Sequence, residues 1–291
     1  MCTTNTPRSD LAADVIIDPA RGFLNTFKGA DPLYPRVIAK AREAGRPISF
    51  TAIYPGAAGV VANSQEVGAE FSRSGWNAAH LELQDVEALF NREQWVLGPY
   101  TVQAADRARL AADLRTRYEA DYIRAWLNYV RAGSVVRFNN PASAGVQLER
   151  LGDLQAPPLL QMLALASVAT NIDSSEVGTT FQPVRAVVLP DSARYVFDQN
   201  SGYVNGLLEL ASAMRGLDAA AAGAAQETAK SNAAEVTQTL RNAVASIEKG
   251  FQSAGPNALG LARTIRALLL QPAEYAEALL GQVASNTLNE K

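Results

Sequence analysis

The sequence of 291 residues contains a single cysteine and a single histidine, and these scarcities exclude several classes of site. Cys2 cannot form a disulfide within the chain, and no zinc-finger spacing exists. Metal sites that need two histidines, such as HExxH, are excluded too. A Ser-His-Asp triad would have to use His80 as its base, and no GxSxG element is present. We interpret His80 as an ordinary surface or boundary residue.

Long apolar runs, phosphate-binding loops and excess positive charge are also missing. No run of about 18 apolar residues occurs, so the sequence predicts no membrane span in this chain. Neither GxxxxGK[ST] nor a complete GxGxxG fingerprint is present, and Gly56 and Gly59 are interpreted as turn residues. The net charge of −3 argues against nucleic-acid binding, which typically uses a basic face.

Carboxylates are plentiful but scattered along the chain. Glu119 and Asp121 are two residues apart, so on a helix they point to different sides and make a poor acid–base pair. Asp85 and Glu87 stand near an expected helix start, where acidic residues interact favourably with the helix dipole. We therefore expect no catalytic residue, no cofactor-binding residue and no metal site, and we predict that the protein is not an enzyme.

Apolar residues make up 48% of the chain and charged residues 19%, which is enough to build a core. The strongest helical pattern runs from about 104 to 132. Its apolar stripe repeats at nearly every fourth position: Leu110, Leu114, Tyr118, Tyr122, Trp126 and Tyr129. A base-stacking platform would need a basic groove beside the aromatics, so we interpret the stripe as the buried face of a helix.

The rest of the chain also predicts a mainly α fold, a multi-helix elongated bundle with a few short extended segments. Extended segments are expected at RPISFTAIYPG and EVGAEFSRSGW. Helices are expected near 31–45 with Asp31 as cap, at 76–83 capped by Ser72 or Ser74, at 85–95, at 219–249, at 257–270 and at 272–284. Pro157 and Pro158 suit the first turn of a further helix, where their missing amides are not needed.

Four regions are predicted from these patterns. They are a flexible lead-in at 1–21, a first helical part at 22–170, an irregular connection at 171–200 and a second helical part at 201–291. The last contains an alanine-rich helix whose small side chains permit close approach of a neighbour. We hypothesise self-association through Ala221, Ala225 and Ala229; an exposed helix within a monomer is the alternative.

Several short elements occur in an order that resembles one known family. They are carried by Leu24, Gly29 and Tyr34; by Val67, Gly68, Phe71, Ser72, Gly75 and Trp76; by Trp95 to Gly98; by Asp121, Tyr122, Ile123 and Trp126; by Pro158, Leu159 and Leu163; and by Phe181, Gln182 and Pro183. Their order and spacing resemble the periplasmic region of the TssM (IcmF) family, the large inner-membrane subunit of type VI secretion systems. The resemblance covers roughly residues 22 to 291, and Ala156-Pro157-Pro158 departs from the family's usual Ser-Pro.

This resemblance implies a structural subunit, a periplasmic scaffold that links inner-membrane and outer-membrane components through protein–protein contacts. The implied partners are a TssJ-like outer-membrane lipoprotein, a TssL-like inner-membrane protein and further copies of the chain. It also implies a segment of a longer, inner-membrane-anchored protein, ending before a β-rich C-terminal domain. A free-standing soluble helical binding module and, less favoured, a soluble all-α enzyme are the alternatives.

Overall fold

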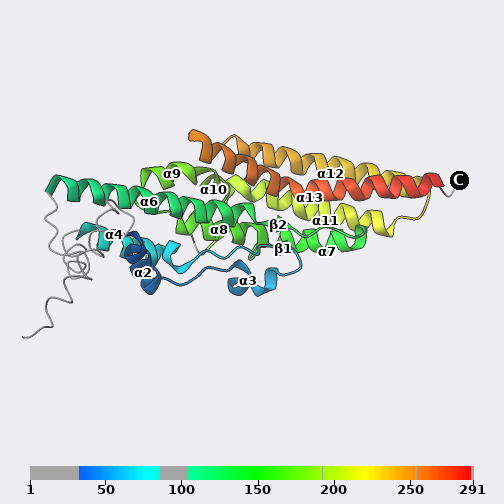
Figure 1. Ribbon diagram of the computed structural model, residues 1–291. Helices are drawn as coiled ribbons and strands as arrows, with labels where there is room; N and C mark the ends of the chain where they lie inside the picture. Colours follow the sequence, from blue (N-terminus) through cyan, green and yellow to red (C-terminus); the bar gives the residue numbers. More distant parts are fainter. Residues whose placement is uncertain (1–32, 86–103, 192, 253, 290–291) are drawn as a thin grey trace, which may run out of the picture. The chain divides into compact units, whose positions relative to one another are not determined.

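The computed structural model describes residues 33–85, 104–191, 193–252 and 254–289 (Figure 1). They form helices and one small antiparallel sheet, so the predicted mainly α class is confirmed. The chain divides into two compact units. Unit 1 takes in the chain up to Arg46 and Ala69–Asp121, and unit 2 takes in Pro47–Gly68 and Tyr122–Lys291. The limits of these two units differ from those of the four predicted regions, and the four regions stay a prediction.

Unit 1 is built from short helices and the first part of a long one. α2 (Tyr34–Ala44) packs against the 3-10 turn η2 (Ala69–Phe71) and against α4 (Arg73–Gln84). α6 (Ala104–Arg131) begins in this unit and continues into unit 2 at Tyr122. Its predicted limits are confirmed, and the stripe from Leu114 to Tyr129 is buried as expected.

Unit 2 begins with an irregular segment. Ile48 pairs with Val67 in an isolated bridge, and β1 (Val61–Ala62) pairs with β2 (Ser134–Val135). Between them lie α3 (Phe50–Ile53) and the 3-10 turn η1 (Pro55–Ala57). The predicted extended segments are therefore wrong over most of their length. Phe50 is fully buried by the turn at α3, which local pattern alone does not reveal.

The helices of unit 2 surround α8 (Pro158–Ala169), which is buried on nearly every side. Its all-round apolar character marks it as a central helix. Pro158 opens it and Pro157 is its N-cap, as the proline pair predicts. The Tyr122 hydroxyl donates to the Ala169 carbonyl at 2.8 Å, which ties the α6 stripe to this helix.

Four helices complete the packing, and α11, α12 and α13 run side by side (Figure 1). They are α7 (Pro141–Leu151), α11 (Asp198–Ala219), α12 (Ala224–Glu248) and α13 (Gly255–Asn289). α11 and α12 are joined by a turn that contains Gly223 at a φ of +96°, a conformation that favours glycine. α12 confirms the alanine-rich helix, although Ala221 lies in the turn before it.

Two local expectations differ from the structure. The connection at 171–200 is predicted to be irregular, but α9 (Ser175–Thr180) and α10 (Gln182–Val187) form within it. The helices expected at 257–270 and 272–284 are one helix, α13, with Pro272 inside it. Leu269 and Ala273 on either side of Pro272 are fully buried, so packing holds the helix through the proline. Asp31 and residues 86–95 of the helix expected at 85–95 lie outside the described residues.

Candidate functional site

His80, the only histidine, is half-buried on α4. Its Nδ1 lies 3.1 Å from the Trp76 carbonyl one turn earlier, and its ring stacks on the Trp76 indole with centroids 4.0 Å apart. The Tyr118 ring stands edge-on at 6.2 Å. These contacts use the imidazole as a packing element in an aromatic cluster.

The acidic residues singled out from the sequence are spread over different places. The carboxylate of Asp121 accepts a hydrogen bond from the Tyr34 hydroxyl at 2.5 Å, and Asp85 is the C-cap of α4. Glu87 lies outside the described residues. Within the described ranges, no three His, Cys, Asp or Glu side chains gather closely enough to hold a metal ion.

The motif residues at the start of α4 shape a tight junction with α2. Ser72 Oγ accepts a hydrogen bond from the Gly75 amide at 3.1 Å and donates to the Ala69 carbonyl at 2.7 Å, so it caps the helix as predicted. A Cβ on Gly75 would stand 2.6 Å from the Ala69 and Glu70 carbonyl oxygens. Glycine is therefore needed there because the backbone of η2 passes too close for any side chain.

Gly45, just after α2, is held even more tightly by the same turn. A Cβ at this position would lie 1.9 Å from the Ala69 carbonyl oxygen and 2.5 Å from Ser72 Oγ. Gly45 and Gly75 thus approach the η2 backbone from two helices. Local sequence marks Gly45 only as the end of a helix, since nothing local reveals the second chain segment.

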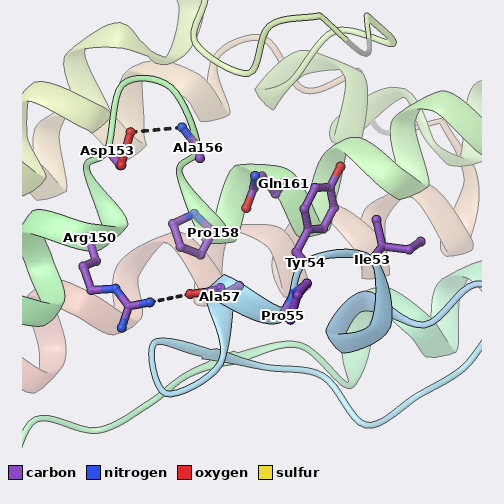
Figure 2. A pocket seen from close by; sticks show the side chains of 10 residues that line it. Ile53, Tyr54, Pro55, Ala57, Arg150, Asp153, Ala156, Pro158 and Gln161 are labelled. Carbon is purple, nitrogen blue, oxygen red and sulfur yellow. Dashed lines mark hydrogen bonds between the residues drawn. The ribbon is translucent and has the colours of Figure 1, made fainter.

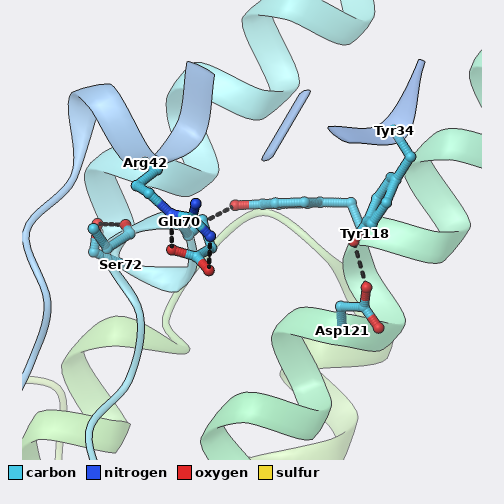
Figure 3. Close-up of polar contacts among 7 residues, drawn as sticks. Tyr34, Arg42, Glu70, Ser72, Tyr118 and Asp121 are labelled. Carbon is cyan, nitrogen blue, oxygen red and sulfur yellow. Dashed lines mark hydrogen bonds and ion pairs between the residues drawn. The ribbon is translucent and has the colours of Figure 1, made fainter. Parts of the chain in front are cut away.

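Polar side chains fasten α6 to this junction (Figure 3). Tyr118 donates to the Glu70 carbonyl at 2.5 Å, and Arg42 makes two hydrogen bonds to the Glu70 carboxylate at 2.9 and 3.1 Å. The Arg42 hydrogen bond lowers the pKa of Glu70 below its ordinary value. Arg117 lies over the Tyr34 ring at 4.1 Å from its centroid. These contacts join α2, η2 and α6 within unit 1.

A pocket of about 320 Å³ lies within unit 2 (Figure 2). It is lined by α3 and η1, by the end of α7 with the loop after it, and by the start of α8. The lining residues are Ile53, Tyr54, Pro55, Gly56, Ala57, Arg150, Asp153, Ala156, Pro158 and Gln161. The sequence does not reveal this pocket, because its walls come from segments about 100 residues apart that only the fold brings together.

Polar groups on the pocket wall are mostly engaged with the backbone. Arg150 donates to the Gly56 carbonyl, and Asp153 Oδ1 accepts from the Gln155 and Ala156 amides at 2.8 and 3.0 Å. The Tyr54 hydroxyl lies 3.1 Å from the Tyr195 hydroxyl, and burial is the main cause that raises the pKa of Tyr54. Gln161 differs, since its side-chain amide makes no hydrogen bond within the described residues.

The fold and these contacts define a mainly α protein in which short motifs cap, turn and pack the helices. In the described residues no helix is long and apolar enough to cross a bilayer. The model of the IcmF-related family, described as "Intracellular multiplication and human macrophage-killing", matches residues 5–171. This match covers more than half of the sequence. The chain therefore belongs to the IcmF-related family, which confirms the resemblance seen in the motifs.

The fold is also similar to a solved structure titled "Type VI secretion system membrane core complex". The TM-score is 0.65 at 19% sequence identity, and the likeness covers 90% of this chain and 52% of that chain. The present chain thus spans about half the length of the solved one. No curated protein matches the sequence.

Proposed function

We propose that the chain is a structural subunit of a type VI secretion membrane complex, and specifically a periplasmic helical segment of an inner-membrane-anchored TssM-like protein. In this role it acts as a scaffold that links inner-membrane and outer-membrane components through protein–protein contacts. The observation that carries the proposal is the agreement of two comparisons. Family membership rests on residues 5–171, and the likeness to the membrane core complex extends over 90% of the chain.

The proposed role is non-catalytic, and the contacts of the motif residues support it. Ser72 and Gly75 shape a helix junction, Trp76 and Trp126 are buried, and His80 stacks on Trp76. Their chemistry is used for packing and capping. A 35-residue helix such as α13 has a length of about 50 Å, which suits a rigid spacer.

The proposed partners are a TssJ-like outer-membrane lipoprotein, a TssL-like inner-membrane protein and further copies of the chain. Exposed apolar side chains offer contact points for them: Leu81 is 69% exposed, Val146 57% and Leu259 44%. We expect photo-crosslinking residues at these positions, in cells of the native host, to give adducts with subunits of the secretion complex. Lys249, exposed at the end of α12, is the control position. Adducts only with unrelated proteins would contradict the proposal.

Self-association through α12 is tested separately. Ala225 is exposed and Ala229 half-exposed on this helix, while Ala221 is exposed in the preceding turn. Changing Ala221, Ala225 and Ala229 to Glu should shift a concentration-dependent oligomer toward monomer in analytical ultracentrifugation. Ala234, Gln238 and Asn242 are exposed on the same helix at the same spacing, so their change to Glu is the matched control. An unchanged mass distribution in the first variant would refute this contact.

A further inference from the structure

Two tyrosines of unit 2 that are 141 residues apart in the sequence meet through their side chains. The hydroxyl oxygens of Tyr54 and Tyr195 lie 3.1 Å apart and share a hydrogen bond, and the rings stand edge-on with centroids 6.5 Å apart. Both side chains are half-buried, and Tyr54 also lines the pocket (Figure 2). The fold thus brings two phenols that solutes can reach into direct contact.

Each ring of this pair is held in place from its own backbone. The Tyr54 amide donates to the Phe50 carbonyl at 2.8 Å, and its ring lies 5.8 Å from the ring of the fully buried Phe50. The Tyr195 carbonyl accepts a hydrogen bond at 2.9 Å from the side chain of Asn200, which is also fully buried. Tyr195 stands in a loop, so its ring can move the short distance that a bond between the rings requires.

The other tyrosines of unit 2 are placed differently. Tyr122, Tyr129 and Tyr203 are buried, and the hydroxyls of the first two donate to backbone carbonyls. Tyr275 is half-buried, but its ring packs edge-on against Phe138 at 5.8 Å. Accessibility and contact between two phenols are therefore combined at the pair formed by residues 54 and 195.

Two phenols in contact can be joined by oxidation. Burial is the main cause that raises the pKa of Tyr54, so this phenol is neutral at physiological pH and loses a proton together with its electron. The phenoxyl radical that results carries its unpaired electron partly on the ring carbons beside the oxygen. Two such radicals form one carbon–carbon bond, and hydrogen then moves from each joined carbon to oxygen. Overall, two tyrosines lose two electrons and two protons and keep both hydroxyls.

We propose that Tyr54 and Tyr195 are a modification site, at which one-electron oxidants join the two rings into a dityrosine cross-link. Two oxidant molecules take up one electron each, and the two protons pass to solvent. The chain has a single cysteine and cannot form an internal disulfide, so this pair supplies a covalent tie that its cysteine chemistry cannot. The inference does not depend on the scaffold role or on any partner subunit.

The cross-link ties down a segment of unit 2 that is built from short elements. Within Pro47–Gly68, α3 has four residues, η1 three and β1 two. Segments with little regular structure open at a lower free energy than long packed helices. A bond across a sequence separation of 141 residues also restricts the unfolded chain. The oxidised chain should therefore be more stable, and this segment should open less often.

The test oxidises the full chain at low protein concentration with light, tris(bipyridine)ruthenium(II) and persulfate, which gains two electrons and becomes two sulfate ions. Dityrosine fluorescence, the mass of the monomer and mass spectrometry of tryptic peptides identify the product. We expect a monomer that has lost two hydrogen atoms, and a joined peptide pair that contains Tyr54 and Tyr195. Its melting temperature should rise by about 5 °C or more, and hydrogen exchange of residues 48–62 should slow.

Three conservative variants locate the reaction. Tyr54→Phe and Tyr195→Phe keep the ring and remove one hydroxyl, so each should fold, lose the cross-link and show no rise in melting temperature after oxidation. Tyr275→Phe changes the half-buried tyrosine beside Phe138 and is the matched control. It should give the cross-link in the same yield as the unaltered chain.

The proposal is overturned if no peptide pair containing Tyr54 and Tyr195 forms, or if coupling joins separate chains or other tyrosines instead. An equal yield from the chain unfolded in urea would overturn it as well, because the folded geometry would then play no part. A cross-link that leaves melting temperature and hydrogen exchange unchanged would refute its stabilising effect. Failure of the scaffold proposal would leave these results unaffected, so the two proposals are tested separately.

Discussion

The interior packing of unit 1 relies on different kinds of residue from the interior packing of unit 2. In unit 1, Gly45 and Gly75 let the helices approach the η2 backbone, and Ser72, Tyr118 and Arg42 bind specific groups on it. In unit 2, α11, α12 and α13 pack mainly through aliphatic side chains such as Leu240 and Leu269. The first kind of packing needs particular residues at particular places, whereas the second needs volume and pattern.

This difference matches the reach of the comparisons. The family model matches residues 5–171, which include unit 1 and the beginning of unit 2, while the fold likeness covers 90% of the chain. Aliphatic cores accept many substitutions when volume and pattern are kept. A glycine that lies against a backbone carbonyl accepts no substitution, because any side chain would collide with the carbonyl oxygen. The family model thus reports on the part of the chain that carries the motifs, whereas the fold likeness extends over nearly all of it.

The largest effect should come from adding one methyl group in unit 1. Gly45→Ala would place a Cβ 1.9 Å from the Ala69 carbonyl, and we expect a loss of about 3 kcal/mol in the stability of unit 1. Hydrogen exchange of peptides from α2 and α4 measures it. Gly216→Ala is the control in α11, where the Cβ meets open space, and should stabilise by about 0.5–1 kcal/mol. Equal changes in stability for the two variants would contradict the proposed difference between the units.

The aliphatic packing of unit 2 should depend on volume. Leu240 is fully buried on α12, and a Cβ on Gly206 of α11 would lie 3.1 Å from its Cδ1. Leu240→Ala should cost about 2–5 kcal/mol, because it leaves a cavity. Leu240→Met keeps the volume and should cost less than about 1.5 kcal/mol. Urea unfolding measures both, and a Met variant as unstable as the Ala variant would contradict volume-based packing.

Two buried tyrosines, one in each unit, differ in whether their hydroxyl groups are hydrogen-bonded. Tyr118 in unit 1 donates to the Glu70 carbonyl, whereas the Tyr203 hydroxyl on α11 has no hydrogen-bond partner within the described residues. Tyr118→Phe should destabilise by about 1–2 kcal/mol, because it leaves the carbonyl unpaired. Tyr203→Phe should be neutral or stabilising. Thermal unfolding measures the stability of the two variants. A larger loss of stability for Tyr203→Phe than for Tyr118→Phe would contradict this prediction.

The smallest effect concerns pH. Because Arg42 lowers the pKa of Glu70 in the folded chain, ionised Glu70 stabilises unit 1 above the ordinary glutamate pKa. That contribution is lost as pH falls through the lowered pKa, where the folded carboxylate becomes protonated. Arg42→Gln should therefore reduce the acid-induced loss of hydrogen-exchange protection in α2 and η2. Lys40→Gln, whose exposed partner is Glu43, is the control. Identical pH profiles for Arg42→Gln and the unaltered chain would refute this linkage.

Sequence periodicity was sufficient for the long helices and insufficient where distant segments meet. The α6 stripe and the alanine-rich α12 follow from local pattern, and Ser72 follows from its place before an apolar run. The unbroken α13 does not, because its passage through Pro272 depends on burial of Leu269 and Ala273. The pocket was equally hidden, since Ile53 and Gln161 belong to elements that only the fold joins.

The measurement that tests the scaffold proposal most directly is an immunoblot of fractionated native-host cells, with an antibody raised against this chain. Co-precipitation from the solubilised inner-membrane fraction should accompany it. The account predicts a band well above 31.0 kDa in that fraction, together with TssL-like and TssJ-like proteins. A band near 31.0 kDa in the soluble fraction, without those proteins, would contradict it.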